Sequence, residues 1–242
     1  MFKGFFMPVL IRLLFVFALS VPALAVAAYA AINPRLASLP AAENPKKILL
    51  LPPQMFVAEL SAGGVIQKQD DWTRQANENL LTATEAYFRE SGRFEALRMP
   101  LLDSQDAETV VSHIGLYDRV AYAIYIYGRG LSSGWQHKKA EWDYTLGEGL
   151  AFLREKTGAD AALIFTGADI IASGGRKAAF AAGLLLGIAI PVGQSFISVG
   201  LADLRSGDIR WLSYDQSMTL DSRDPAAVQE LVKDFFASYP RQ

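Results

Sequence analysis

The stretch SFISVGLADLRSGDIRWLSY, residues 195–214, decides the fold. It holds two apolar-rich runs, 195–204 and 209–214, separated by the short turn RSGD at 205–208. Two such runs joined by a short turn with Gly and Asp predict a β-hairpin. The second half of the chain is therefore expected to carry part of a sheet, and the flanking segments indicate how that sheet is completed.

Three further segments are interpreted as strands. Residues 48–51 (ILLL) are continuously apolar and are followed by Pro52-Pro53, and residues 161–165 (AALIF) form a second apolar run that continues toward Ile171. Runs of this kind fit strands that are covered on both faces. Residues 93–99 are shorter and mixed in character, and we expect a strand there too.

Helical spacing of apolar residues indicates the covering elements. Four helices are expected: 72–87 with Asp70 or Asp71 as N-cap and Gly92 as the stop, 105–127 capped by Asp103 or Ser104, 147–156 ending at Gly158, and a last helix with Asp224 as N-cap and Pro225 at its first position. The order β-α-β-α-α-β-(apolar segment)-β-β-α predicts an α/β (α+β) fold. We expect one three-layer-like domain with a mixed sheet flanked by helices.

The N-terminus has the order of a secretion signal. Lys3 and Arg12 precede the apolar run 13–21, Pro22 interrupts it, and the triplets ALA at 23–25 and AYA at 28–30 carry small residues at alternate positions. An uncleaved membrane anchor is the alternative, because no charge interrupts residues 13–32 and about 20 apolar residues suffice to span a bilayer.

These features predict a three-part organisation. Residues 1–32 form a hydrophobic export helix that is either a signal peptide or an N-terminal membrane anchor, residues 33–46 form a flexible linker, and residues 47–242 form a periplasmic α/β domain. The expected location is the periplasm, with the chain either soluble after cleavage or tethered to the inner membrane.

Composition excludes several kinds of chemistry. The chain has no cysteine, which rules out disulfides, thiolate metal sites and a lipid attached to cysteine. It has 23 basic and 25 acidic residues and no block of basic residues. We therefore expect no nucleic acid partner.

Residues 178–192 form an apolar segment without any charged or polar side chain. Fifteen helical residues rise only about 22 Å, less than the ~30 Å hydrocarbon core of a bilayer. One interpretation is a core helix packed on the sheet, with Gly183 and Gly187 allowing close approach. The other is a surface that meets a membrane or another subunit, since these glycines have GxxxG spacing. The side chains assigned to that surface are Phe180, Leu184, Leu185, Leu186, Ile188 and Ile190.

No catalytic, cofactor-binding or metal site is visible, and we expect no enzyme activity. Residues 130–134 (GLSSG) match the G-x-S-x-G pattern, but that pattern needs a strand before the serine and a helix after it. We interpret 128–134 as a glycine loop, and the alternative is a hydrolase or small-ligand enzyme that uses it. Trp135, Trp142 and Tyr144 are candidates to line a ligand pocket beside this loop.

Several segments resemble a group of proteobacterial envelope proteins. These are GADAALIF at 158–165, SGGR at 173–176, SVGLADLRSGDIRW at 198–211, WDYTLG at 142–147 and KKILLLPP at 46–53. The folded core of that group is similar to the curli-secretion channel (CsgG-like) proteins and to periplasmic lipoproteins with a TolB-N-terminal-like domain. The chain departs from them in lacking a lipid-bearing cysteine and the long amphipathic strands of a transmembrane barrel.

The resemblance implies a function through protein contacts. Such proteins are non-enzymatic factors in assembly, secretion or regulation. We therefore expect an envelope protein partner, with membrane association through residues 1–32 or 178–192 and homo-oligomer formation as further alternatives. The sequence does not identify the partner.

Overall fold

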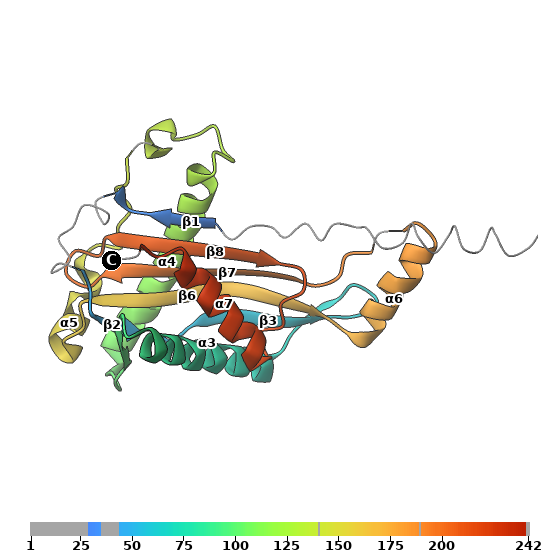
Figure 1. Cartoon of the computed structure of the whole chain (residues 1–242), viewed down its shortest axis with the longest axis horizontal. Helices are drawn as coiled ribbons and strands as arrows, with labels where there is room; N and C mark the ends of the chain where they lie inside the picture. The colour runs from blue at the N-terminus through green and yellow to red at the C-terminus, as the bar shows by residue number, and fades with distance from the viewer. Residues whose placement is uncertain (1–28, 35–43, 140, 189, 241–242) are drawn as a thin grey trace, which may run out of the picture.

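A mixed sheet of eight strands organises the chain in the computed structural model (Figure 1), which describes residues 29–34, 44–139, 141–188 and 190–240. Its main path runs β1-β8-β7-β6-β2-β5, and β3 pairs with both β6 and β4. The strands are β1 (Tyr29–Ile32), β2 (Lys47–Leu50), β3 (Gln54–Leu60), β4 (Ile66–Lys68), β5 (Glu95–Arg98), β6 (Ala161–Ala172), β7 (Gln194–Asp203) and β8 (Ile209–Ser217).

The hairpin expected at 195–214 is present and forms the centre of the sheet. β7 and β8 pair antiparallel, and Gly207 in the connecting turn has a φ of 74°, a conformation that favours glycine. β7 also pairs antiparallel with β6 along ten residues, from Ala161↔Asp203 to Ile170↔Gln194. The other strands join the sheet at β6 and β8, either directly or through β2 and β3.

Strand β6 receives two successive parallel partners on its other edge. β2 pairs with the first residues of β6, and β3 pairs with the later ones, from Thr166 to Ala172. Pro52 and Pro53 lie between β2 and β3 and interrupt the ladder, because proline has no amide hydrogen to donate. The sequence indicated the strand before the prolines but not β3 or β4 after them.

Helices cover both faces of the sheet, which makes three layers, as expected. They are α3 (Asp70–Ser91), α4 (Ser104–Gly128), α5 (Ala151–Thr157), α6 (Gly174–Leu185) and α7 (Pro225–Ala237), with 3-10 turns η2 (Gln136–Lys139) and η3 (Glu148–Leu150). α3 and α7 pack on one face around Phe88, Phe165 and Trp211. α4 packs on the other around Tyr117 and Ile164.

Helix caps follow the expected residues in most cases. Asp103 accepts a hydrogen bond from the amide of Asp106 at the start of α4, and Asp224 accepts one from the amide of Ala226 at the start of α7. Gly92 ends α3 in the left-handed conformation. The expected cap of α3 is wrong by one residue, because Gln69 occupies the N-cap and the two aspartates lie in the first turn, where they complement the helix dipole.

One boundary needs correction. Residues 29–32 were assigned to the export segment, but they form β1, which pairs with β8 from Tyr29↔Tyr214 to Ile32↔Trp211. Asn33, assigned to the linker, is buried and donates its amide to the carbonyl of Arg210. The remainder of the expected export segment, 1–28, and residues 35–43 of the linker lie outside the described residues. Within the described residues, no helix is both long and apolar enough to cross a membrane.

Candidate functional site

The end of helix α6 exposes a group of large apolar side chains. Leu184, Leu185, Leu186 and Ile188 are 54% to 88% exposed, and we call these four residues the apolar tip. Soluble proteins rarely leave contiguous apolar side chains in water without a use for them. The interpretation of 178–192 as a core helix is therefore wrong, since these leucines are exposed rather than buried in the core.

Local contacts explain why the chain turns at the apolar tip. Ser173 caps α6 by accepting from the amide of Arg176, so residues 174–177 form the first turn of the helix. Gly187 follows the helix with a φ of 71°, and the amide of Ile188 donates to the carbonyl of Gly183. A side chain at Gly183 would lie 2.7 Å from the Ile188 carbonyl. The two glycines therefore serve the helix end and do not form a GxxxG helix interface.

Phe180 and Ile190, the other residues assigned to this surface, are only partly exposed. The Arg176 guanidinium fastens the returning chain to the helix, because its Nε donates to the carbonyl of Pro191 at 2.8 Å. Figure 1 shows α6 at one end of the molecule, beyond the ends of β3 and β6. The apolar tip therefore lies at one end of the molecule, and hydrogen bonds within the chain fix its conformation.

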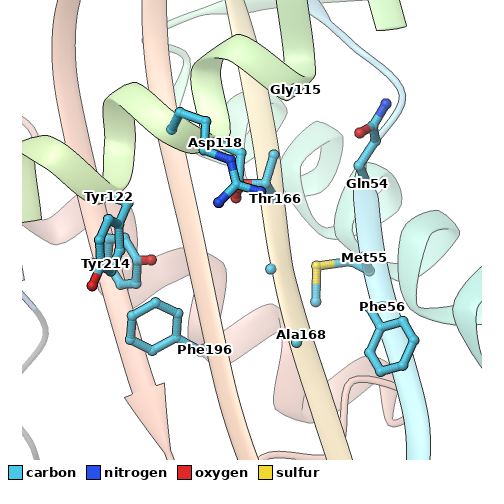
Figure 2. A pocket seen from close by; sticks show the side chains of 12 residues that line it. Gln54, Met55, Phe56, Gly115, Asp118, Tyr122, Thr166, Ala168, Phe196 and Tyr214 are labelled. Atoms are coloured by element: carbon cyan, nitrogen blue, oxygen red, sulfur yellow. The ribbon is translucent and has the colours of Figure 1, made fainter. Parts of the chain in front are cut away.

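A groove of about 600 Å³ lies between α4 and the sheet (Figure 2), and we call it the sheet groove. Its lining comes from α4 (Gly115, Asp118, Arg119, Tyr122), β3 (Gln54, Met55, Phe56), β6 (Thr166, Gly167, Ala168), β7 (Phe196) and β8 (Tyr214). Figure 2 shows α4 crossing the strands at one end, with Phe56 and Phe196 on the strands beyond it. Phe56 is 41% exposed and Tyr122 53% exposed, so aromatic surface faces the solvent here.

The polar groups of the sheet groove suit binding better than proton transfer. Burial raises the pKa of Tyr214, and the nearby Asp118 raises it further, so the phenol stays protonated. Thr166 and Ser198 hydroxyls hydrogen-bond to each other at 2.9 Å. The groove therefore offers aromatic surface, hydroxyl groups and the charged side chains of Asp118 and Arg119.

Of the three aromatic residues expected to line a ligand pocket, Trp142 and Tyr144 contact each other, whereas Trp135 contacts a different ring. Trp135 stacks on Tyr127 and is largely exposed, whereas Trp142 donates its indole N–H to the carbonyl of Ile209 at 2.7 Å. Tyr144 is buried against Trp142 in the core beneath α4. Two of the three thus attach the loop to the hairpin.

The serine loop at 130–134 has a different context from a nucleophile elbow. Helix α4 precedes it rather than a strand, and the Ser132 hydroxyl accepts a hydrogen bond from the amide of Gly134 at 3.2 Å. His113 Nδ1 lies 2.7 Å from the carbonyl of Thr109 within α4. In the described part of the chain, no group of three or more His, Cys, Asp or Glu residues is placed to hold a metal ion.

Comparison with known proteins shows distant likenesses only. No protein-family model matches the chain, and no curated protein matches it. Among solved structures, it is similar to the PelC dodecamer from Paraburkholderia phytofirmans, with a TM-score of 0.39 and 10% identity over 89% of this chain and 98% of that one. It is also similar to lipoprotein GNA1162 from Neisseria meningitidis, with a TM-score of 0.34 and 13% identity over 81% of this chain and 100% of that one. At this level of similarity, these two structures do not indicate the function of the chain.

Proposed function

We propose that the chain is an exported, non-enzymatic protein of the bacterial cell envelope that acts in assembly, secretion or regulation by contacting another protein. The apolar tip is the main support for this proposal, because its four large apolar side chains are exposed to solvent at one end of the molecule. The signal-like order of residues 1–32 and the resemblance to CsgG-like and TolB-N-terminal-like proteins support a location in the periplasm.

The energetics of burial favour a partner at this position. Covering a leucine side chain contributes about 1.5–3 kcal/mol relative to leaving it exposed. The three leucines of the apolar tip would therefore supply a sizeable share of the free energy of a protein complex.

A protein surface fits the apolar tip better than a lipid surface does. Helices that lie on membranes carry Lys and Arg along their polar face. The described residues of α6 include two cations, Arg176 and Lys177, and the Arg176 guanidinium is committed to the carbonyl of Pro191. Both cations lie in the first turn of α6, at the opposite end of the helix from the apolar tip, and they make only a weak attraction for anionic lipid at the tip.

The sheet groove is the second contact surface in this proposal. Aromatic side chains are enriched at protein interfaces because they combine large area with few rotatable bonds. Phe56 and Tyr122 stand on opposite sides of the groove, on β3 and α4, and leave space between them for a partner's side chain.

Site-specific photocrosslinking of the full chain in its host tests the proposal. A benzoylphenylalanine at Leu185, and separately at Tyr122, should give a covalent adduct of one defined mass. The same group at Lys233, which is exposed on α7, serves as the control and should give none.

The mass of the adduct identifies the kind of partner. An adduct of twice the chain mass indicates a second copy of the chain, and any other single protein mass indicates a different partner. Absence of a protein adduct at Leu185 and at Tyr122 would contradict the proposal.

A further inference from the structure

A second cavity, of about 570 Å³, lies at the end of the sheet opposite α6, near α5 and the turn between β7 and β8 (Figure 1). We call it the basic cavity. Its lining consists of Asn44, Pro45, Lys46, Arg154, Asp160, Asp203, Arg205, Ser206 and Arg210. Four of these side chains are cations and two are acids. The contacts of the two acids therefore determine how much positive charge is available to bind a ligand.

One carboxylate oxygen of Asp160 binds the backbone. Its Oδ2 accepts hydrogen bonds from the amides of Lys46 and Lys47 at 2.9 and 3.0 Å. Burial raises the pKa of this carboxyl, but the two amides and the nearby Arg154 outweigh burial and leave the pKa below its ordinary value. Asp160 thus remains ionised and fixes the start of β2.

Asp203 is occupied in the same way by the hairpin turn. Its Oδ1 accepts from the amides of Arg205 and Ser206 at 2.7 and 3.1 Å, and its Oδ2 accepts from Nε and Nη2 of Arg210. Burial raises the pKa of Asp203, but these hydrogen bonds lower it further than burial raises it. The carboxylate therefore neutralises Arg210 and no other cation of the cavity.

The four cations and two acids of the cavity leave a net charge of +2, with Arg154 near the ionised Asp160. Among the described residues, no ion pair or side-chain hydrogen bond involves the ammonium of Lys46 or the guanidinium groups of Arg154 and Arg205. The Nη1 of Arg210 is buried and has no hydrogen-bond partner. Buried donors in proteins are almost always paired, so an unpaired guanidinium nitrogen on a residue that lines the basic cavity points to an acceptor that comes from outside the chain.

We infer that the basic cavity binds a multiply charged anion through phosphate or carboxylate groups. Guanidinium groups match the planar, paired oxygens of these anions and form short, charge-assisted hydrogen bonds with them. The volume exceeds that of a single phosphate and falls in the range of small-molecule sites. Because the cavity and the apolar tip lie at opposite ends of the molecule, this inference stands independently of the proposed protein contact.

Calorimetric titration of the full chain in non-ionic detergent tests the inference, with pyrophosphate and citrate as probes and sodium chloride holding the ionic strength constant. Saturable binding of at least one probe is expected. The double substitution Arg154→Gln and Arg205→Gln removes two cations without removing a hydrogen bond or an ion pair among the described residues. It should weaken binding by about tenfold or more, the loss expected for charged hydrogen bonds.

The matched control is Arg89→Gln, at an exposed position on α3, which should bind the probe as the unchanged chain does. Thermal unfolding in chloride alone shows whether the double variant is folded. If the double variant is not folded, the single variant Arg205→Gln, on the exposed turn, replaces it. This variant should also bind the probe more weakly than the unchanged chain does. The inference is overturned if neither probe binds saturably, or if a folded variant binds as tightly as Arg89→Gln.

Discussion

At the scale of single residues, Asp169 is the most constrained acid of the fold. It lies on β6 with 1% of its surface exposed, and its Oδ2 accepts from the amide of Ser222 at 2.8 Å. Asn79 on α3 donates to the carbonyls of Ser222 and Arg223 at 3.0 Å. The Arg223 guanidinium lies over the ring of Trp72. Asp169 therefore helps hold the loop that leads into α7.

This burial gives Asp169 a defined effect on stability. Desolvation raises the pKa of its carboxyl, with Asp221 adding to the rise and the Ser222 hydrogen bonds and Arg223 opposing it. The folded state then holds the proton more tightly than the unfolded state does. The free energy of unfolding contributed by this group is present at low pH and falls as pH rises from about 4, the ordinary aspartate value, through the raised value.

We expect Asp169→Asn to remove this pH dependence. The amide oxygen can still accept from Ser222, and the side chain carries no charge at any pH. Urea unfolding at pH 4.5 and pH 7.5 should show the variant gaining stability relative to the unchanged chain at the higher pH. Glu108→Gln, exposed on α4, is the control and should follow the unchanged chain. The prediction would be contradicted if the free energy of unfolding changed by the same amount between the two pH values for Asp169→Asn and for the unchanged chain.

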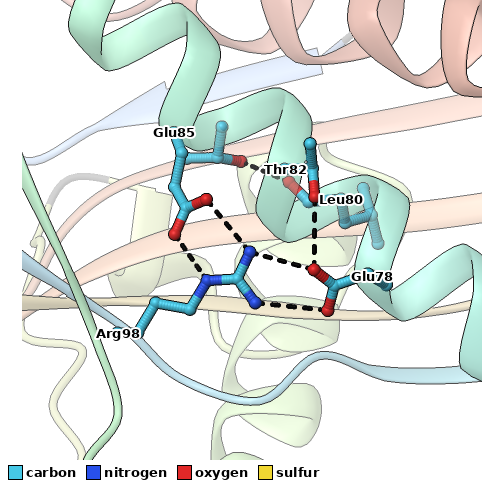
Figure 3. A network of polar contacts seen from close by, with 6 residues as sticks. Glu78, Leu80, Thr82, Glu85 and Arg98 are labelled. Atoms are coloured by element: carbon cyan, nitrogen blue, oxygen red, sulfur yellow. Dashed lines mark hydrogen bonds and ion pairs between the residues drawn. The ribbon is translucent and has the colours of Figure 1, made fainter.

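At the scale of elements, the edge strand β5 depends on a contact with α3. Among the described strands, β5 pairs with β2 alone, over four residues. Figure 3 shows the Arg98 guanidinium between Glu78 and Glu85 of α3. Its Nη1 and Nη2 donate to Glu78 at 3.2 and 3.0 Å, and its Nε and Nη2 donate to Glu85. Glu85 and Glu78 both raise the pKa of Arg98.

Substitution of Arg98 by Ala should lower the free energy of unfolding by about 1 kcal/mol. The group is partly exposed, so each ion pair contributes only about 0.2–1 kcal/mol, and salt should reduce the loss. Urea unfolding at low and high sodium chloride measures it. Arg74→Ala is the control, because Arg74 pairs with Asp71 inside α3 and should cost less than about 0.5 kcal/mol. Equal losses for both would show that Arg98 does not support β5.

The same elements show what could be predicted from sequence and what could not. Helices α4 and α7 were predictable because Asp103 and Asp224 cap them by contacts between neighbours in sequence. β3 was missed because Pro52-Pro53 is a strong local signal for an end of strand structure. The chain resumes pairing with β6 after the prolines, and that depends on a partner more than a hundred residues away.

The same distinction between contacts local in sequence and contacts between distant segments applies to the candidate sites. The residues of the apolar tip are consecutive and could be named from sequence, although only the fold decides between core and surface. The sheet groove and the basic cavity combine residues from distant segments. No local pattern around Arg154 indicates that it lines the same cavity as Arg205.

At the scale of the whole molecule, the surfaces are arranged along one direction. The apolar tip lies at one end, the basic cavity at the other, and the sheet groove between α4 and the strands. Strands β6 and β7 run along this direction with continuous pairing over ten residues. A partner at the apolar tip and an anion in the basic cavity would therefore occupy two ends of one rigid strand pair.

The place of β1 in the sheet leads to a prediction about processing. Tyr29 packs its ring edge-on against Tyr125 at 5.7 Å and lies beneath the Arg129 guanidinium. Cleavage after Ala25 keeps this strand intact, whereas cleavage after Ala30 removes half of it. N-terminal sequencing of the exported chain should therefore give a start at Val26 or earlier. A folded chain that begins at Ala31 would contradict this expectation.

The pairing of β1 with β8 also bears on when the protein can fold. Among the described residues β1 is the first strand along the chain and β8 the last, yet Tyr29 pairs with Tyr214. A ribosome delivers these strands in order, so the outer edge of the sheet stays open until nearly all of the chain has been synthesised. Pairing between such distant segments is slow. For the export proposed above, that delay would favour passage through the membrane, because β1 pairs with β8 only after the last strand has crossed.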